Sequence, residues 1–385
     1  MKVFLLALSS ISFVYGYHNS SLPVQFVKAN NDFTIRLYSH VTNYTLGNVV
    51  FTSFPVESML ALISLGAKGE TQKELETVIN LSNKTKNEIK DYFKSVFDNL
   101  KEIKEPKFDA LDNILVKKGI DLKPEFKQLA ETYFHTKFGS FDSKTDAVQK
   151  INSLIEKTTS SNSTHLVNEK HVDDTTHFII LSTQFVRGSW KHRFPKSDTY
   201  RGDFYNTKTD VAKVEMMKLS AHLLISRDVK YHFRILILPY IHGMAGFFIF
   251  LPDDTDGLPL IERNGHDMWQ RRQFSRKYVE VHLPKFKIDS IIDMTHSLKN
   301  MGITKLISGA DLTGILNENL DVSIVAQVAH IEVDEDGTKP PTRERDITEN
   351  TTRAEEVEVF KVDRPFIFSV MYNDLGLIIG KVNTL

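Results

Sequence analysis

The spacing of hydrophobic residues along the chain predicts helices first and strands later. After residue 30, apolar side chains recur every three or four positions, as on one face of an amphipathic helix. Asn31 and Asp32 precede this pattern, and we expect them to cap the helix. Its apolar face would consist of Phe33, Leu37, Tyr38 and Val41. A second helix is predicted to follow Pro55 and to end at Gly66.

Two more helices are predicted before residue 160. Thr71 and Glu74 have the spacing of a capping box, in which each side chain bonds the backbone of the other, and would start the third helix. Helical spacing returns from Thr145 to Lys157. The apolar residues of this fourth helix are Val148, Ile151, Leu154 and Ile155.

The last two thirds of the chain have the pattern of strands. Two apolar runs, Phe233 to Leu238 and Phe247 to Leu251, are joined by a glycine-containing connection and predict a buried hairpin. A half-buried strand is predicted where Val279, Val281 and Leu283 alternate with polar residues. Further strand-like segments are 357–362, 366–372 and 377–382. Because helices and strands are segregated and do not alternate regularly, the fold class is α+β.

Composition narrows the class of protein. The 385 residues are 41% hydrophobic and 25% charged, which is enough apolar material for a large globular core, and no linker or repeat divides the chain. The net charge of -1 gives no overall attraction to nucleic acids or acidic membranes, so we expect neither as a partner. The absence of cysteine excludes disulfides, thiol nucleophiles and thiolate metal sites.

The amino terminus has the pattern of a secretory signal peptide. Lys2 precedes an apolar run from Val3 to Val14, and Gly16 precedes the first polar stretch. We therefore expect a signal peptide at 1–16, a single domain at 17–385, and a secreted, extracellular protein. Six Asn-X-Ser/Thr acceptors fit secretion and predict surface positions. They are Asn19, Asn43, Asn80, Asn83, Asn162 and Asn350.

The sequence gives no positive support for an enzyme, a cofactor or a metal site. A nucleophile elbow, a phosphate loop, a dinucleotide fingerprint and a zinc-protease helix are all missing from the sequence. His330 and Glu332 are interpreted as two side chains on one strand face rather than as metal ligands. Trp190 and Trp269 are interpreted as packing residues. The basic cluster Arg271, Arg272, Arg276 and Lys277 is interpreted as a solvated face.

A family resemblance becomes specific near the carboxyl terminus. The stretch FKVDRPFIFSV, from Phe360 to Val370, closely resembles the serpin signature. Other segments resemble the family in the same order along nearly the whole chain: GNVVFTSFPVESMLALISLGAKGETQKEL, VRGSWKHRF, VEMMKL and VEVHLPKFKID. The resemblance implies about nine helices around three mostly antiparallel β-sheets. It also implies a monomer that offers an exposed reactive loop to a protease.

The resemblance assigns roles to the residues between the last strands. In inhibitory serpins the cleaved loop inserts into the largest sheet and carries the bound protease with it. EDGT stands where serpins have the hinge of this loop, so the loop would span about 338–356. The hinge residues are Glu335, Asp336, Gly337, Thr338, Pro340 and Pro341. Counting as the family does places the scissile bond between Thr351 and Thr352.

The hinge departs from the inhibitory pattern. Inhibitory serpins have small residues there, whereas this chain has Pro340 and Pro341, which cannot donate hydrogen bonds inside a sheet. Alternation from Thr338 would also turn Glu344 and Asp346 toward the buried face. Two lost ladder bonds and two unpaired buried carboxylates would penalise insertion by roughly 10 kcal/mol.

A second departure lies where the sheet must open. Inhibitory members usually have a hydrogen-bonded Ser, Asn and His there, and alignment places Pro55, Ser182 and Gln327 at these positions. The usual polar latch is therefore expected to be altered or absent.

Two functions remain open at this stage. The first is a protease inhibitor that works without complete loop insertion, against a serine protease or a papain-like cysteine protease. Arg345 and Arg353 are alternative sites for trypsin-like cleavage, and Ile347 and Thr348 for papain-like cleavage. A few secreted insect serpins, including silk-gland members, are similar in having lost the usual hinge and are associated with cysteine proteases. The second is a non-inhibitory carrier, storage or signalling serpin, because a glycan on Asn350 would obstruct a protease.

Overall fold

The computed structural model describes most of the chain. The described residues are 22–45, 47–103, 105–159, 172, 175–265, 273–318, 320–338 and 356–385. The predicted signal peptide, most of the predicted loop and three acceptors lie outside them. The predicted site residues outside the described part are Asn19, Asn162, Pro340, Pro341, Arg345, Ile347, Thr348, Asn350, Thr351, Thr352 and Arg353, together with Trp269, Arg271 and Arg272 of the other interpretations.

Eight α-helices and fifteen strands occur in the described residues. The helices are α1 (Val24–Thr42), α2 (Ser53–Gly66), α3 (Gly69–Val78), α4 (Lys86–Glu102), α5 (Pro124–Phe134), α6 (Lys144–Thr159), α7 (Leu258–Arg263) and α8 (Thr295–Asn300). The strands are β1 (Val49–Thr52), β2 (Lys107–Lys117), β3 (Lys137–Phe141), β4 (Phe178–Ser189), β5 (Tyr200–Tyr205), β6 (Val211–Asp228), β7 (Phe233–Pro239), β8 (Ala245–Pro252), β9 (Ser275–Pro284), β10 (Phe286–Asp293), β11 (Ile324–Val333), β12 (Gly337–Thr338), β13 (Glu358–Lys361), β14 (Phe366–Tyr372) and β15 (Leu375–Val382).

The strands pair into one six-stranded and one nine-stranded sheet. The six-stranded sheet has the order β10-β11-β12-β4-β2-β3, with β11 also pairing β4. In the nine-stranded sheet, the first part of β6 pairs with β5 and the last part pairs with β7, while β9 pairs with the middle. We expected three sheets, and the difference arises because the long β6 belongs to two groups of strands and joins them into one sheet.

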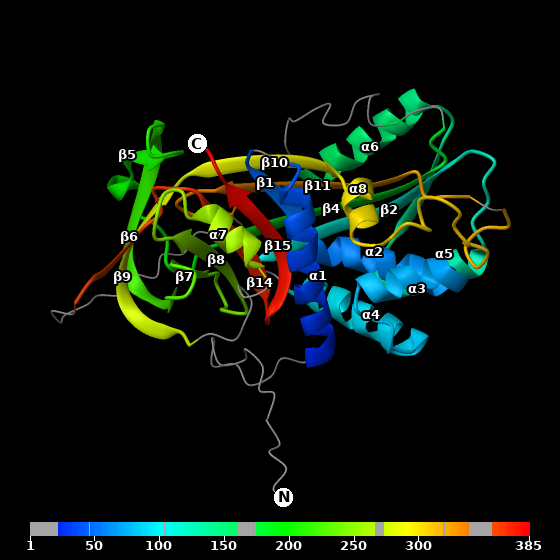
Figure 1. Ribbon diagram of the computed structural model, residues 1–385, viewed down its shortest axis with the longest axis horizontal. Coiled ribbons are helices and arrows are strands. Elements are labelled where there is room, and N and C mark those ends of the chain that lie inside the picture. Colours follow the sequence, from blue (N-terminus) through cyan, green and yellow to red (C-terminus); the bar gives the residue numbers. More distant parts are fainter. Residues whose placement is uncertain are drawn as a thin grey trace, which may run out of the picture.

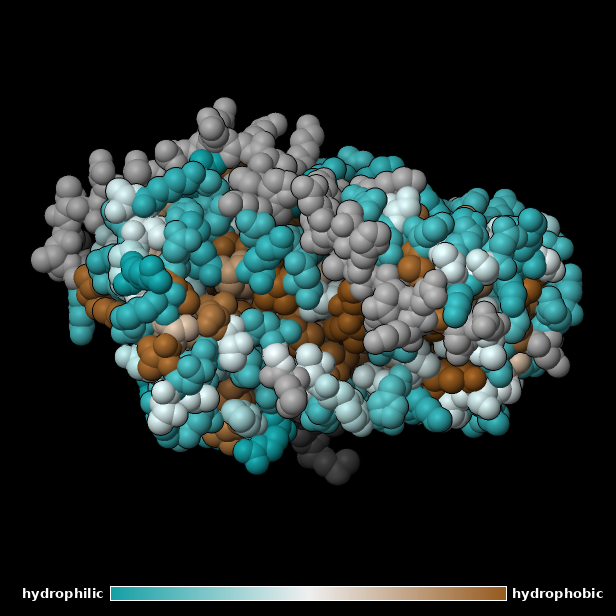
Figure 2. All heavy atoms as spheres, turned by 90° about the horizontal axis from the view of Figure 1, so that it is seen from above, coloured by the Kyte–Doolittle hydropathy of each residue, from teal (hydrophilic) through white to brown (hydrophobic). Residues whose placement is uncertain are grey.

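Helices cover both faces of the six-stranded sheet (Figure 1). On one face α6 packs on β2, β3 and β4, and its buried side chains form a small apolar cluster that includes Ile151 and Ile179. On the other face α2 packs on β2 and β4 within a larger core that runs from Leu22 to Val382. Residues that alternate along β4 and β11 therefore point into two different cores. Seen from above, the outer surface is mostly hydrophilic, with apolar residues gathered near its middle (Figure 2).

Most of the predicted elements are confirmed. The hairpin is β7 paired with β8, and β9 buries Val279, Val281 and Leu283 as its alternation predicts. The three carboxyl-terminal strands are β13, β14 and β15, and the helix predicted at Thr145 to Lys157 is α6. Gly66 ends α2 as predicted, although that helix begins two residues before Pro55.

Two predicted helix starts are wrong for the same physical reason. The first helix begins at Val24, and Asn31 lies inside it, where its amide donates to the carbonyl of Asp374 and accepts from the N–H of Gly376. Thr71 and Glu74 lie inside α3 and bond residues 304, 305 and 311. These polar side chains serve contacts with distant segments rather than the ends of their own helices.

No helix in the described part of the chain is long and apolar enough to cross a membrane.

Candidate functional site

The seam between β4 and β11 is closed along most of its length. The two strands run parallel and pair from Ile179 with Ile324 to Phe185 with His330. Beyond His330 the two-residue strand β12 enters between them, antiparallel to both. A chain that continued β12 would therefore separate β4 from β11 as a new central strand.

At the end of the seam the backbone of Gly337 lies so close to that of Gly188 that only glycine fits at position 337. It pairs with Ser189 of β4, and a Cβ atom at this position would lie 1.9 Å from the carbonyl oxygen of Gly188. Any larger residue would have to displace backbone. The next residue, Thr338, is fully buried beside Tyr240 and ends the described part of the hinge.

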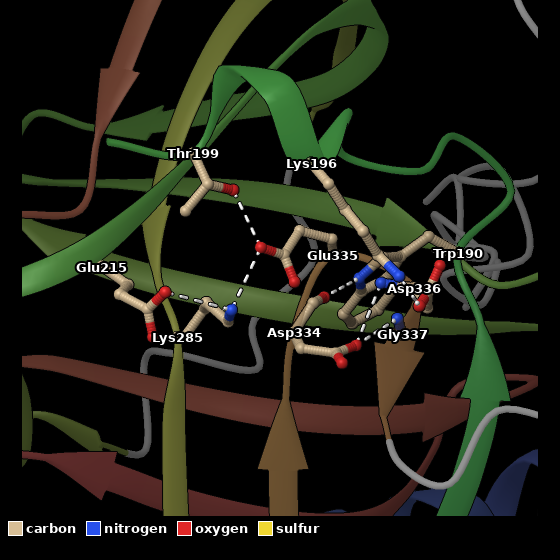
Figure 3. Close-up of polar contacts among 9 residues, drawn as sticks. All are labelled: Trp190, Lys196, Thr199, Glu215, Lys285, Asp334, Glu335, Asp336 and Gly337. Carbon is tan, nitrogen blue, oxygen red and sulfur yellow. Dashed lines mark hydrogen bonds and ion pairs between the residues drawn. The ribbon is translucent and has the colours of Figure 1, made fainter. Parts of the chain in front are cut away.

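The backbone before Gly337 is held in a tight turn by Asp334 (Figure 3). Its carboxylate accepts from the N–H of Asp336 at 2.9 Å and from the N–H of Gly337 at 3.2 Å. The indole N–H of Trp190 donates to the carbonyl of Asp334 at 2.9 Å, and the ring of Trp190 stacks on Tyr240. Trp190 is thus a packing residue, as predicted, and it also fixes the hinge.

The side chain of Glu335 ties the hinge to two further segments. Its carboxylate accepts from Thr199 Oγ1 at 2.8 Å and pairs with Lys285 Nζ at 3.1 Å (Figure 3). Burial favours the neutral carboxyl, but the hydrogen bonds and the positive charge of Lys285 outweigh it and lower the pKa of Glu335. The same contacts raise the pKa of Lys285 against its own desolvation. Both directions are those expected of an ion pair at this distance.

Asp336 adds contacts with the segment that follows β4. Its carboxylate lies 3.1 Å from Lys196 Nζ and 3.6 Å from Arg193 Nη1. Its carbonyl accepts from the N–H of Trp190, and the carbonyl of Glu335 accepts from the N–H of Phe194. All three acidic residues before Gly337 are therefore bound to the protein, and the hinge is fixed up to Thr338.

The predicted latch residues are brought together only in part. Ser182 and Gln327 face each other across the seam, as the alignment predicts. Pro55 lies in α2, where its carbonyl accepts from Ser58 at 2.9 Å. A polar contact is nevertheless present, because Ser182 Oγ donates at 2.7 Å to Asp112 of β2. The latch is altered, as expected, but it is not absent.

The two facing residues bond away from each other. Gln327 accepts from the N–H of Thr52 at 3.0 Å, and its own amide N–H group donates to Thr52. Burial raises the pKa of Asp112 to about 7, against the hydrogen bonds from Ser182 and Ser58. Gln327 is thereby attached to β1 and Ser182 to β2.

Sequence reasoning named Glu335 to Thr338 as the hinge but missed the side chains that contact it and the partner of Ser182. Lys285 and Thr199, which bind Glu335, and Asp112, which binds Ser182, were not candidates, and they act on residues far away in the chain. A lysine between a proline and a phenylalanine in PKF gives no local signal of an ion pair with the hinge. His330 and Glu332 lie two residues apart in β11 and therefore share one face of the strand, as predicted, and His330 bonds Asp289 of the neighbouring strand at 2.6 Å.

Comparison with known proteins agrees with this geometry. The family model described as "Serpin (serine protease inhibitor)" matches residues 28–385. Alaserpin from Manduca sexta is 29% identical over 372 residues, which cover 92% of this chain and 93% of the relative. Antichymotrypsin-2 from Bombyx mori is 26% identical over 362 residues, covering 91% of this chain and 96% of that protein.

Solved structures show the same fold. The crystal structure of Serpin48 from the insect Tenebrio molitor superimposes with a TM-score of 0.86 at 26% identity, covering 96% of this chain and 100% of that one. Uncleaved ovalbumin gives a TM-score of 0.82 at 21% identity and supports the fold alone, covering 94% of this chain and 100% of that one. With a matching family model over nearly the whole chain and a closed central seam that ends at Gly337, the chain belongs to the serpin family, which that model describes as serine protease inhibitors and whose members are not enzymes.

Proposed function

We propose that this protein is a secreted inhibitor that presents the segment after Thr338 as bait to a serine protease or a papain-like cysteine protease. The observation that supports the proposal most directly is the closed seam with the hinge held at its end. The segment that follows leaves the six-stranded sheet at β12, and the chain returns in the nine-stranded sheet at β13. The proposed bait segment is therefore anchored to a β-sheet at each end, by β12 and by β13.

The register of β12 fixes what an inserted loop would meet. Each step forward from Thr338 would be one step back along both β4 and β11, starting from Gly188 and Val333. Positions 340 and 341 would lie in the ladder of both strands, where the two prolines forfeit two hydrogen bonds, at about 1 kcal/mol each. Thr338 is fully buried, so alternation puts positions 344 and 346 on the same buried face.

The two acidic positions would have different surroundings. Position 344 would lie between Ser182 and Gln327, whose hydroxyl and amide already donate to Asp112 and Thr52, so a carboxylate there would gain these donors only by displacing those bonds. Position 346 would lie between Ile180 and Val325, which are apolar and buried. One carboxylate would therefore have polar neighbours and the other none, and the penalty for insertion lies between roughly 5 and 10 kcal/mol. We propose that insertion is slow or incomplete, not that it is forbidden.

The decisive experiment uses three proteases with the mature protein. Two relatives are named antitrypsin and antichymotrypsin, both from Bombyx mori, so trypsin and chymotrypsin test the serine branch and papain the cysteine branch. We expect near-stoichiometric loss of activity of one of them, with an SDS-stable complex if a serine protease is trapped. Mass spectrometry of the cleaved chain identifies the scissile bond. Cleavage by all three without inhibition would favour the carrier, storage or signalling role.

Secretion and glycosylation form part of the same proposal. Asn43, Asn80 and Asn83 are exposed, so a transferase can reach them. The threonine of the Asn83 acceptor, Thr85, caps α4 through its hydroxyl, so modification there has to compete with this contact. Expression in a secreting eukaryotic cell, with and without N-glycosidase treatment, should give a glycoprotein in the medium whose mass falls on treatment. Retention inside the cell without glycan would contradict the proposal.

A further inference from the structure

Three side chains on the nine-stranded sheet form a hydrogen-bonded chain that runs from a hydroxyl through an imidazole to a carboxylate. Tyr200 OH lies 2.8 Å from His282 Nδ1, and His282 Nε2 lies 2.9 Å from Glu280 Oε1. Tyr200 belongs to β5, whereas His282 and Glu280 belong to β9, and both strands pair with β6 at one end of the molecule (Figure 1). This order of groups is the one that activates a nucleophile.

The pairing of the strands brings the three side chains together. Glu280 and His282 are two residues apart in β9, so they share the face of the strand that is not buried. Met216 of β6 pairs with Tyr200 on one side and with Pro284 on the other. Tyr200 is therefore two residues from the level of His282, and a tyrosine side chain spans that distance. The two rings meet edge to face, with their centres 5.8 Å apart.

The direction of each hydrogen bond follows from the carboxylate. Hydrogen bonds from Lys218 and His282 lower the pKa of Glu280 against its partial burial, so Glu280 is ionised at neutral pH and only accepts. His282 Nε2 therefore carries the proton that bonds Glu280, which leaves Nδ1 of the neutral ring as an acceptor. The hydroxyl of Tyr200 is the donor to Nδ1, so its proton already points at a base.

The base is more shielded from solvent than the hydroxyl residue. Lys218 Nζ lies 2.9 Å from Glu280 Oε2, the oxygen that does not bond His282, and so holds the carboxylate in place. The side chain of His282 is 13% exposed and that of Glu280 is 26% exposed. Tyr200 is 38% exposed. A reagent in solution therefore reaches Tyr200 more readily than the imidazole behind it.

We propose that Tyr200 is a covalent modification site that accepts an acyl group from an activated ester, with His282 as its general base. The Tyr200 oxygen forms a bond to the acyl carbon, the bond from that carbon to the leaving oxygen breaks, and the leaving group departs as an anion. The phenolic proton moves to His282 Nδ1, and the Glu280 carboxylate stabilises the resulting imidazolium. Each protein molecule takes up one acyl group. The site is independent of the proposed protease inhibition.

Tyr44 is a control within the same molecule. Tyr44 and Tyr200 are the exposed tyrosines in the described part of the chain, and Tyr44 is the more exposed of the two, at 63%. The Tyr44 hydroxyl accepts a hydrogen bond from the amide of Asn300 at 3.0 Å, and that contact supplies a donor rather than a base. Exposure alone would make Tyr44 the more reactive residue, whereas activation by a base makes it Tyr200.

Acetylation of the mature protein by p-nitrophenyl acetate at neutral pH tests the proposal. Mass spectrometry of the digested protein gives the rate at each tyrosine. Hydroxylamine then removes acetyl groups from tyrosine oxygen but not from lysine nitrogen, which identifies the product. We expect Tyr200 to react about tenfold faster than Tyr44 or more, because a positioned general base contributes at least that factor.

Variants separate the roles of the base and the carboxylate. H282Q keeps a side chain that can bond the hydroxyl but removes the base, so the rate at Tyr200 should fall to about the rate at Tyr44. E280Q should slow Tyr200 by about two- to fivefold, the factor that an exposed ion pair contributes. The matched control is H296Q, which removes an exposed histidine beside the ring of Tyr44 and should leave the rate at Tyr200 unchanged.

Circular dichroism checks that each variant is folded, and the rate at Tyr44 should be the same in H282Q, E280Q and the unchanged protein. Two outcomes would overturn the proposal. The first is a rate at Tyr200 no higher than that at Tyr44 in the unchanged protein. The second is an unchanged rate at Tyr200 in H282Q.

Discussion

Glu57 offers a quantitative test of the core next to the seam. It lies in α2 with 1% of its surface exposed, and Asn30 Nδ2 donates to one of its carboxylate oxygens at 2.7 Å. Burial raises the pKa of Glu57 to about 8, against the Asn30 hydrogen bond and the charge of Arg36. Burial and the negative charge of Glu57 raise the pKa of nearby Tyr92 as well. Ionising Glu57 in the folded state is therefore unfavourable.

The sign of the pH effect follows from this raised pKa. The contribution of Glu57 to stability is fully present below its unfolded pKa of 4.5 and is lost as pH rises through its folded pKa of about 8. One pKa unit corresponds to 1.36 kcal/mol, so the total loss is about 5 kcal/mol. The Glu57→Gln variant keeps the shape of the side chain and removes the ionisation, so its stability should fall less with pH.

Urea unfolding of the unchanged protein, Glu57→Gln and a control, Glu131→Gln, at pH 5, 7 and 9 measures the difference. Glu131 is exposed on α5 and should behave as the unchanged protein does. Any fixed cost of the new amide is the same at each pH and cancels when the values are compared. The free energy of unfolding of Glu57→Gln, relative to that of the unchanged protein, should rise from pH 5 to pH 9. A constant difference would refute the reasoning.

Four further predictions concern the hinge and the seam. Gly337→Ala should destabilise the protein by about 1–3 kcal/mol, because the added Cβ meets the Gly188 carbonyl; an unchanged melting midpoint would contradict this. Asp112→Asn should stabilise by about 4 kcal/mol at pH 9 and little at pH 3, since its folded pKa is about 7 and its unfolded pKa is 3.8. Glu335→Gln should destabilise by about 1–3 kcal/mol at pH 7. That difference should vanish in acid, because a lowered folded pKa gives stability that is present above 4.5 and is lost as pH falls through the folded value. Cleavage of the reactive loop should raise the melting temperature only slightly, and a large rise would refute the argument from the prolines.

Local sequence patterns predicted the positions of the strands better than they predicted the roles of polar side chains. The alternation in β9 and the two apolar runs of β7 and β8 are set by burial, which a short stretch of sequence records directly. Asn31 and Thr71 were wrongly predicted to cap helices, because a polar residue that bonds a distant segment has the same local appearance as a cap. Motif order predicted a hinge at Glu335 to Thr338, whereas the partners of Glu335 come from separate parts of the chain and leave no pattern of their own.

The seam and the loop oppose insertion to different extents. Where the seam must open, Gln327 bonds Thr52 of β1 and Ser182 bonds Asp112 of β2, so each side chain holds its strand to its own half of the protein. Separating β4 from β11 at this level leaves both of these bonds intact and breaks only backbone bonds, which an inserted strand would replace on both sides. The loop segment that would insert lacks two backbone N–H donors, at Pro340 and Pro341, and would place Asp346 at an apolar position. The limit on insertion therefore lies in the sequence of the loop rather than in the sheet. Replacing both prolines and Asp346 by alanine should restore a large rise in melting temperature after cleavage, while Asp112 and Gln327 need no change.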